Sequence, residues 1–450
     1  MTETTEKPHL RRELGLVQST ALSITDMIGI GPFITIPLFL ATMGGPQAML
    51  GWILGAALAF CDGLVWAELG AAMPKAGGSY NYLREAFGPR TVGRWFSFLV
   101  VWQIIFSAPL SVASGSIGFA SYFHYLVPSI SPWGIRVFAA LIPLVMILVL
   151  YRRIRTVGNL SIVLLVGVLI GCFWIIGSGL PQLSAERIFD FPPNAFRLDW
   201  SFCAGLGAAT LFAMYDYFGY YNVCYLAEEI RDPGRVIPRA MLFSIVAVAT
   251  LYILMNASIL SVVPWREAQH SKFIASTYIE KLHGVGAGNL MTLLMLWIAF
   301  SSVFSVLLGY TRIPYAAAAD NNFFSVFARL HPKGEFPYVS LITLGLIASA
   351  FSLLKLPEVI GGLVAIRVMN QYLPQAIGFF VLRFRKPDMP RPFRMWLYPL
   401  PGIAIVLGWL YILGTSNRRS LLFGVAVFAV GSIAFFIRAR LRREWPFERE

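Results

Sequence analysis

The chain has 450 residues, of which 57 % are hydrophobic and only 13 % are charged. A soluble enzyme, a disordered chain or a disulfide-rich secreted scaffold needs more charge, less apolar surface or more than the four cysteines present here. The composition is typical of a protein with many membrane-spanning helices. The 36 Lys and Arg residues exceed the 23 Asp and Glu residues and give a net charge of +13, which in a soluble protein would indicate nucleic-acid binding.

Apolar stretches long enough to cross a membrane recur along the whole chain. A spanning helix needs about 20 mostly apolar residues. The predicted spans cover residues 15–43, 47–72, 95–126, 134–151, 157–179, 201–227, 238–263, 288–315, 338–355, 358–383, 396–414 and 420–438. The sequence therefore predicts an all-α membrane protein with 12 transmembrane helices.

The distribution of the cations predicts how the chain is oriented. With the amino terminus inside, 26 of the 36 Lys and Arg residues lie in predicted cytoplasmic segments, nine lie in outer loops, and Arg367 lies within a span. Cytoplasmic loops carry an excess of Lys and Arg. We therefore expect a multi-pass protein of the cell membrane with both termini in the cytoplasm and no nucleic-acid partner.

No pattern in the sequence indicates enzymatic chemistry. The four cysteines fall within predicted spans without metal-ligand spacing, and the five histidines are scattered. No nucleophile motif or phosphate-binding loop is recognisable. We expect neither an enzyme nor a bound metal or cofactor.

The first predicted span contains a segment that does not suit a regular helix. Residues 28–33 read Ile-Gly-Ile-Gly-Pro-Phe. The two glycines permit non-helical dihedrals, and Pro32 lacks an amide proton and crowds the preceding turn. We predict a break here; the alternative is that the glycines serve close helix packing and Pro32 produces a kink.

The sixth predicted span contains a comparable segment. Residues 215–222 read Tyr-Asp-Tyr-Phe-Gly-Tyr-Tyr-Asn and place a carboxylate and a glycine at mid-span. Non-helical backbone at membrane depth is tolerated only where protein buries it or where it lines a wet cavity. Interrupted helices at matching positions of two inverted halves indicate a substrate site at the midplane. The first and sixth spans have the spacing expected of a 5+5 inverted repeat.

Ordered motifs resemble those of the amino acid, polyamine and organocation (APC) transporter superfamily, whose members have the LeuT fold. Residues 29–33 carry the G-x-G-x-F pattern of the first span. Residues 68–82 are close to the loop E-L…P-x-A-G-G-x-Y-x-Y, and residues 228–240 are close to the turn E-E-x-x-N-P…P-x-A. The resemblance covers about residues 15–440.

The resemblance implies ten core helices in two inverted halves plus two peripheral helices. It divides the chain into a cytoplasmic amino-terminal tail (1–14), a first repeat with spans one to five (15–179), an extracellular loop (180–200), a second repeat with spans six to ten (201–383), spans eleven and twelve (396–438) and a cytoplasmic carboxy-terminal tail (439–450).

The chain departs from the family pattern at three places that bear on the coupling ion and the substrate. Pro32 follows the second glycine, where an aliphatic residue is usual. Many amino acid members carry a Lys in the fifth span that substitutes for sodium, but no charged residue lies between Arg155 and Glu186. Phe304 and Ser305 stand where Asn-Gly is frequent. A proton and a sodium ion near Ser302 both remain open as coupling ions.

A broken helix exposes amide donors at the start of its second half and carbonyl acceptors at the end of its first half, which suits an amino acid zwitterion. We predict that the amides after Gly29 hold the carboxylate and that carbonyls of residues 25–28 and 215–217 accept the ammonium. The resemblance assigns Tyr215 as the aromatic gate that closes the pocket towards the outside. The predicted substrate-binding residues are Thr25, Asp26, Ile28, Gly29, Ile30, Gly31, Phe33, Gln103, Ser107, Tyr215, Asp216, Tyr217, Gly219, Ser302 and Ser305.

Four ionisable side chains fall within predicted spans, namely Asp26, Asp62, Asp216 and Arg367. Each costs about 2.5–3.5 kcal/mol at a helix centre on insertion scales, so each needs a partner, water or a function. Asp216 and Asp26 are candidates for binding a substrate ammonium or carrying a coupled proton, with helix capping or an ion pair as the structural alternative. Asp62 is expected to be structural. Arg367 either pairs with Asp216 or Asp26 or recognises a substrate carboxylate.

The sequence thus predicts a secondary active transporter that moves a small amino acid by alternating access, with proton coupling or exchange. A polyamine or other organocation transporter is the alternative within carriers, and a sensor or channel that retains the fold is the alternative outside them. The expected partners are the small-molecule substrate, a proton or sodium ion and the lipid bilayer. The oligomeric state is not defined by the sequence.

Overall fold

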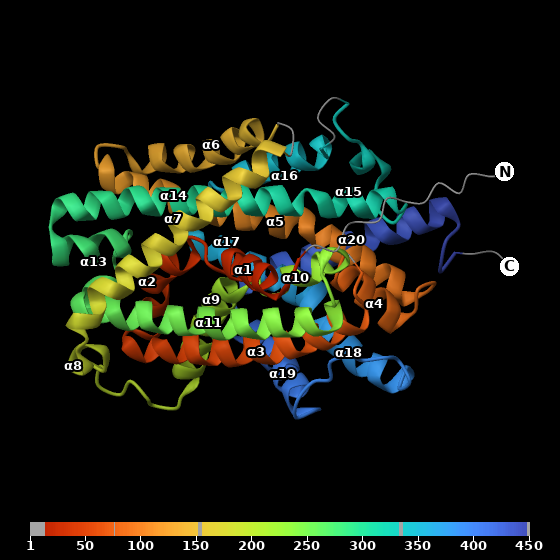
Figure 1. Cartoon of the computed structure of the whole chain (residues 1–450), viewed down its shortest axis with the longest axis horizontal. Helices are drawn as coiled ribbons and strands as arrows, with labels where there is room; N and C mark the ends of the chain where they lie inside the picture. The colour runs from red at the N-terminus through yellow and green to blue at the C-terminus, as the bar shows by residue number, and fades with distance from the viewer. Residues whose placement is uncertain (1–13, 76, 152–154, 333–335, 448–450) are drawn as a thin grey trace.

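The computed structural model describes residues 14–75, 77–151, 155–332 and 336–447. It is built from helices, apart from an isolated β-bridge between Leu14 and Ile230. The long helices run along the longest axis of the molecule, with α4 at one end and α8 and α13 at the other (Figure 1). We refer to these as the α4 end and the α13 end. Most of the predicted amino-terminal tail and the last residues of the carboxy-terminal tail lie outside the described residues.

In chain order the α-helices are α1 (Leu16–Met27), α2 (Gly31–Met43), α3 (Met49–Ala72), α4 (Ser79–Phe87), α5 (Val92–Leu126), α6 (Pro132–Leu150), α7 (Arg155–Gly179), α8 (Ala185–Ile188), α9 (Trp200–Tyr217), α10 (Asn222–Tyr225), α11 (Pro233–Val262), α12 (Trp265–Ala268), α13 (Ile274–His283), α14 (Val285–Tyr310), α15 (Arg312–Ala319), α16 (Tyr338–Phe351), α17 (Leu356–Arg367), α18 (Leu373–Arg385), α19 (Leu400–Thr415) and α20 (Arg418–Arg442). The predicted all-α class is confirmed.

Several of these helices are long and apolar enough to cross a membrane. Six meet that description in the described part of the chain, and the bent pair α1 and α2 adds a seventh when it is counted as one span. Other predicted spans are short or divided in the structure, for example into α9 and α10 or into α17 and α18. The count of twelve spans therefore stays a prediction.

The break predicted in the first span is confirmed. Helix α1 ends at Met27, α2 begins at Gly31, and their axes are bent by 49°. Pro32 lies in the first turn of α2, where a missing amide proton removes no hydrogen bond within the helix. The local sequence therefore ends one helix and begins the next.

The break predicted in the sixth span is also confirmed. Helix α9 ends at Tyr217, and α10 begins at Asn222. Between them Gly219 has φ of +127°, a conformation that side-chain-bearing residues rarely adopt. A Cβ atom at Gly219 would lie 2.8 Å from the carbonyl carbon of Asp26 and 2.9 Å from the amide nitrogen of Met27. Glycine thus allows the second break to lie directly against the first.

Helix α11 joins the two breaks through one side chain. The hydroxyl of Tyr252 lies 2.7 Å from the carbonyl oxygen of Met27 and 3.2 Å from that of Asp216. The last carbonyls of a helix have no partner within it. Tyr252, which is buried, therefore contacts one such carbonyl from α1 and one from α9.

The tenth predicted span contains a distortion that the sequence pattern does not predict. A π-helical turn, Val368–Tyr372, separates α17 from α18. Pro374, two residues beyond this turn, provides no amide proton to the preceding turn. π-helical turns often occur at functional sites, and Arg367 lies at the start of this one.

Candidate functional site

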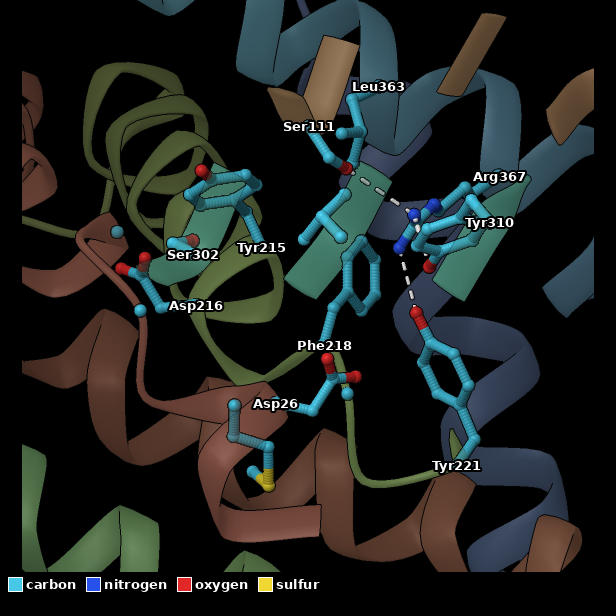
Figure 2. Close-up of a pocket in the computed structure, with 15 residues that line it drawn as sticks. Asp26, Ser111, Tyr215, Asp216, Phe218, Tyr221, Ser302, Tyr310, Leu363 and Arg367 are labelled. Carbon is cyan, nitrogen blue, oxygen red and sulfur yellow. Dashed lines mark hydrogen bonds between the residues drawn. The ribbon is translucent and has the colours of Figure 1, made fainter. Parts of the chain in front are cut away.

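A small cavity of about 70 Å³ lies where the two helix breaks meet α5, α14 and α17 (Figure 2). Its lining residues are Asp26, Met27, Gly29 and Gly31 from the first break, Tyr215, Asp216, Phe218, Gly219 and Tyr221 from the second, Ser111 from α5, Ser302, Val306 and Tyr310 from α14, and Leu363 and Arg367 from α17. Both polar backbone and charged side chains therefore face one cavity.

The cavity brings together part of the predicted site. The predicted residues that line it are Asp26, Gly29, Gly31, Tyr215, Asp216, Gly219, Ser302 and Arg367. The predicted residues that do not line it are Thr25, Ile28, Ile30, Phe33, Gln103, Ser107, Tyr217 and Ser305. The backbone of Ile28 and Ile30 still belongs to the break, although both side chains are buried elsewhere.

Other contacts explain why several predicted side chains are directed away from the cavity. Gln103 Nε2 donates to Gln371 Oε1 at 2.9 Å, in a separate polar network around the π-helical turn. The ring of Tyr217 packs edge-on against Trp52. The hydroxyl of Thr25 donates to a carbonyl of its own helix. These side chains do not contact the cavity in this structure.

The structure adds lining residues that the sequence reasoning did not select. They are Met27, Ser111, Phe218, Tyr221, Val306, Tyr310 and Leu363. Residues four apart share one face of a helix. Val306 and Tyr310 continue the face that begins at Ser302, and Leu363 precedes Arg367 by one turn. Helical register from the selected residues would have found Ser111, Val306, Tyr310 and Leu363. It would not have found Phe218 and Tyr221, which lie between α9 and α10.

The start of α2 offers backbone donors to the cavity. The amide of Gly29 donates to the carbonyl of Met27 at 3.2 Å, and the amide of Phe33 donates to that of Ile30 at 3.1 Å. Those of Ile30 and Gly31 donate to no acceptor among the described residues. An N-terminal helix end with free amides favours a bound anion, and a carboxylate suits it.

The glycines at this break permit close approach of neighbouring groups. A Cβ atom at Gly29 would lie 2.7 Å from Ser302 Oγ. A Cβ atom at Gly31 would overlap Asp216 Oδ1 and lie 3.2 Å from the ring of Tyr215. Any side chain at either position would therefore fill the space between the break and the opposite wall.

Asp216 lies in the wall of the cavity and is 2 % exposed. Its Oδ2 accepts a hydrogen bond of 2.6 Å from the hydroxyl of Thr35, while its Oδ1 is buried without a hydrogen-bond partner in the described structure. Neither Asp216 nor Asp26 lies within 4.0 Å of a cationic group in the described part of the chain. Two carboxylates thus face the cavity without an ion pair.

Arg367 has hydroxyl and aromatic neighbours rather than a carboxylate. Its Nη1 donates to the hydroxyl of Tyr221 at 2.7 Å, and its Nη2 donates to Tyr310 at 2.7 Å and to Ser111 at 3.4 Å. Its guanidinium lies 5.2 Å from the ring centre of Phe218. The predicted ion pair of Arg367 with Asp216 or Asp26 is not formed in this structure, because these groups occupy the space around the guanidinium (Figure 2).

Tyr215 connects two spans on one side of the cavity. Its hydroxyl lies 2.7 Å from Ser114 Oγ of α5. Ser114 is three residues beyond Ser111, towards the α13 end of the helix. The hydrogen bond therefore lies on the α13 side of the cavity, where a gate assigned to Tyr215 would close it.

Two further buried carboxylates lie outside the cavity. Asp62 accepts a 2.6 Å hydrogen bond from Tyr220, next to the second break. Glu68 accepts bonds from Arg383 Nε at 2.7 Å and Nη2 at 2.5 Å and lies 3.2 Å from Arg391 Nε. Glu68 therefore joins α3 to α18 and to the segment that follows α18. Asp62 joins α3 to the second break through its hydrogen bond with Tyr220.

Comparison with known proteins identifies the family. The family described as "Amino acid permease" matches residues 14–437. The chain belongs to the amino acid permease family. The chain is therefore a multi-pass membrane transporter rather than an enzyme.

Relatives of this permease include transporters from bacteria and mammals. It is 29 % identical to the large neutral amino acids transporter small subunit 2 of Mus musculus over 414 residues, which are 90 % of this chain and 76 % of that protein. It is 27 % identical to the serine/threonine exchanger SteT of Bacillus subtilis (strain 168) over 92 % of each chain. It is 26 % identical to the Asc-type amino acid transporter 1 of Homo sapiens, over 96 % of this permease and 83 % of that protein.

Proposed function

We propose that the chain is a secondary active transporter that carries a small amino acid by alternating access, with the substrate held in the cavity between the two helix breaks. The observation that carries this proposal is the meeting of both breaks with α5, α14 and α17 around one cavity. Membership of the amino acid permease family supports the substrate class, and the similarity to the serine/threonine exchanger SteT supports exchange.

The break geometry suits the backbone of an amino acid. The free amides of Ile30 and Gly31 lie at the positive end of α2 and would hold the α-carboxylate. The carboxylate of Asp26 would accept the α-ammonium from the other side of the break. The carbonyl oxygen of Met27 already accepts from the hydroxyl of Tyr252 at 2.7 Å and from the amide of Gly29 at 3.2 Å, so Asp26 is the acceptor that remains for the ammonium there.

Barriers on both sides of the cavity suit alternating access. On the α13 side, Tyr215 is hydrogen-bonded to Ser114. On the α4 side, Gln371 donates to Ser79 and to Tyr225 at 3.0 and 3.1 Å. Opening one set of contacts while the other stays closed would expose the cavity to one compartment at a time.

We place the α4 end in the cytoplasm. Helix α4 packs against α18, and the cation-rich segments 75–94 and 383–394 come together at this end. An excess of Lys and Arg marks the cytoplasmic side of a membrane protein. Tyr215 would then be the outer gate.

Exchange and proton coupling are both favoured over sodium coupling by the same observation. Asp216 is buried at the cavity with one carboxylate oxygen unpartnered and no ion pair, so it can hold a proton. Sodium near Ser301 and Ser302 of α14 is the alternative. Uptake that needs sodium and ignores the proton gradient would support that alternative.

An organic cation such as a polyamine is the second candidate substrate, because Asp26 and Asp216 both line the cavity. The buried guanidinium of Arg367 in the same wall opposes it, since like charges repel strongly in a poorly hydrated space. A thermal-shift panel on the purified permease separates the candidates, because a ligand that binds the folded state raises Tm. We expect amino acids to raise Tm and polyamines not to; the reverse would contradict the proposed substrate class.

A further inference from the structure

Arg367 is a buried cation in the cavity wall. The proposed binding of the α-amino and α-carboxyl groups of a substrate does not involve it. Arg367 is 4 % exposed. Its guanidinium donates hydrogen bonds to the hydroxyls of Tyr221, Tyr310 and Ser111. No carboxylate lies within 4.0 Å of it in the described ranges. Hydroxyls and aromatic faces solvate a guanidinium, but they do not neutralise its charge.

The position of Arg367 separates it from the free amides of the first break. Arg367 comes from α17 and Tyr310 from the last turn of α14, whereas Asp216 and Ser302 lie beside the break. In Figure 2 the ring of Phe218 lies between Asp26 and Arg367, with Arg367 on the right of the view and Asp216 and Ser302 on the left. The cavity therefore presents an anion-binding group at a second place, beyond an apolar ring.

Three side chains around this place are suited to a carboxylate. The guanidinium offers planar paired donors that match two carboxylate oxygens. The hydroxyls of Tyr310 and Ser111 accept from Arg367 and each still has a proton to donate to an incoming anion. The three residues come from α17, α14 and α5, so an anion bound among them would contact three spans.

We propose that Arg367, Tyr310 and Ser111 form an anion subsite for a carboxylate in the substrate's side chain, and that acidic amino acids are the preferred substrate class. This inference rests on the proposed function. The α-carboxylate binds the amides of α2, the α-ammonium binds at Asp26, and the second carboxylate neutralises Arg367. A neutral side chain would leave the guanidinium of Arg367 with only its hydroxyl and aromatic contacts.

Isosteric substrate pairs test this subsite without altering size or shape. Proteoliposomes that contain the permease would be tested for counterflow with glutamate and glutamine and with aspartate and asparagine. We expect each acid to be favoured at least tenfold over its amide in the ratio of half-saturating concentrations. If the wild-type protein prefers glutamine and asparagine to the corresponding acids, the proposed subsite is contradicted.

Substitutions at Arg367 test which residue carries the preference. Arg367→Gln should remove the preference for the acid or reverse it, and Arg367→Lys should retain part of it because the charge remains. Arg419→Gln is the control, because that side chain is 83 % exposed on α20. An unchanged acid-to-amide ratio in Arg367→Gln contradicts the inference.

Variants of the neighbouring hydroxyls cover the case in which Arg367→Gln does not fold. Tyr310→Phe and Ser111→Ala each remove a donor and should lower the ratio severalfold, while an unchanged ratio in both counts against the subsite. Counterflow of neutral amino acids alone contradicts the subsite but not the proposed function. Absence of counterflow with every amino acid contradicts the proposed function itself.

Discussion

The hydroxyl of Thr35 in α2 donates a 2.6 Å hydrogen bond to Asp216 in α9, and both side chains are almost fully buried. The bond connects the second half of the first span to the first half of the sixth. Asp216 lines the cavity with its other oxygen unpartnered, so a proton gained or lost there would act at the contact between these helices.

Asp216→Asn should separate proton coupling from exchange. The amide keeps the shape of the side chain and an acceptor for Thr35 but cannot gain or lose a proton. We expect accumulation driven by an imposed pH gradient to be lost and counterflow to remain. Thr35→Ser, which keeps the hydroxyl, is the control. A wild-type response to the pH gradient in Asp216→Asn would remove Asp216 from the proton pathway.

Gly31→Leu and Gly29→Leu should abolish transport without abolishing folding. A side chain at Gly31 would meet Asp216 and Tyr215, and one at Gly29 would meet Ser302, so the cavity would be filled. Gly309→Leu is the matched control, because a Cβ atom there has no neighbour within 4 Å. Expression, Tm and uptake of the three variants would be compared. Retained uptake in Gly31→Leu would exclude this break as the binding site.

Tyr215→Phe should weaken the barrier on the α13 side. Loss of its hydrogen bond to Ser114 removes about 1 kcal/mol, which is about a fivefold shift towards the open state. The readout is the rate at which an impermeant thiol reagent labels a cysteine placed at Val306 in a variant without native cysteines. Ser114→Ala should have the same effect, and the double variant should add little. Unchanged labelling in both single variants would argue that this bond is not a gate.

Glu68→Gln should destabilise the fold rather than alter the cavity. Glu68 is 1 % exposed and contacts Arg383 and Arg391. Removing one partner of a buried charge cluster costs about 3–5 kcal/mol. A thermal melt measures this, with Glu85→Gln as the control because its pair with Lys386 is partly exposed and worth at most about 1 kcal/mol. Equal melting of the two variants would contradict a structural role for Glu68.

Arg367 and Asp216 should behave independently in a double-mutant cycle. They form no ion pair in this structure, so the effects of Arg367→Gln and Asp216→Asn on the free energy of unfolding should add to within about 0.3–0.5 kcal/mol. A double variant that is tolerated better than either single variant would show that the two side chains pair in another conformation.

Features fixed by local chemistry could be predicted from the sequence. Both helix breaks follow from residues that resist helical geometry, and Gly219 shows why, since its backbone conformation and its contact with the first break both require glycine. The presence of Asp216 at the second break followed from the same segment. Such predictions need only neighbouring residues in the chain.

Features that depend on how distant helices meet could not be predicted. The contacts of Arg367 with Tyr221 and Tyr310 join three segments, and nothing in the spacing of the aspartates showed that hydroxyls would take their place. Gln103 was selected as polar and mid-span, but its partner Gln371 lies on the π-helical turn, which the apolar pattern of span ten conceals.

The central claim is that the cavity between the two helix breaks binds an amino acid and carries it across the membrane. Counterflow tests it most directly: proteoliposomes are loaded with unlabelled amino acid, and entry of the labelled form is measured for the wild type, Gly31→Leu and Gly309→Leu. We expect rapid exchange by the wild type and Gly309→Leu and none by Gly31→Leu. Equal exchange by all three, or none by the wild type across a broad amino acid panel, would contradict it.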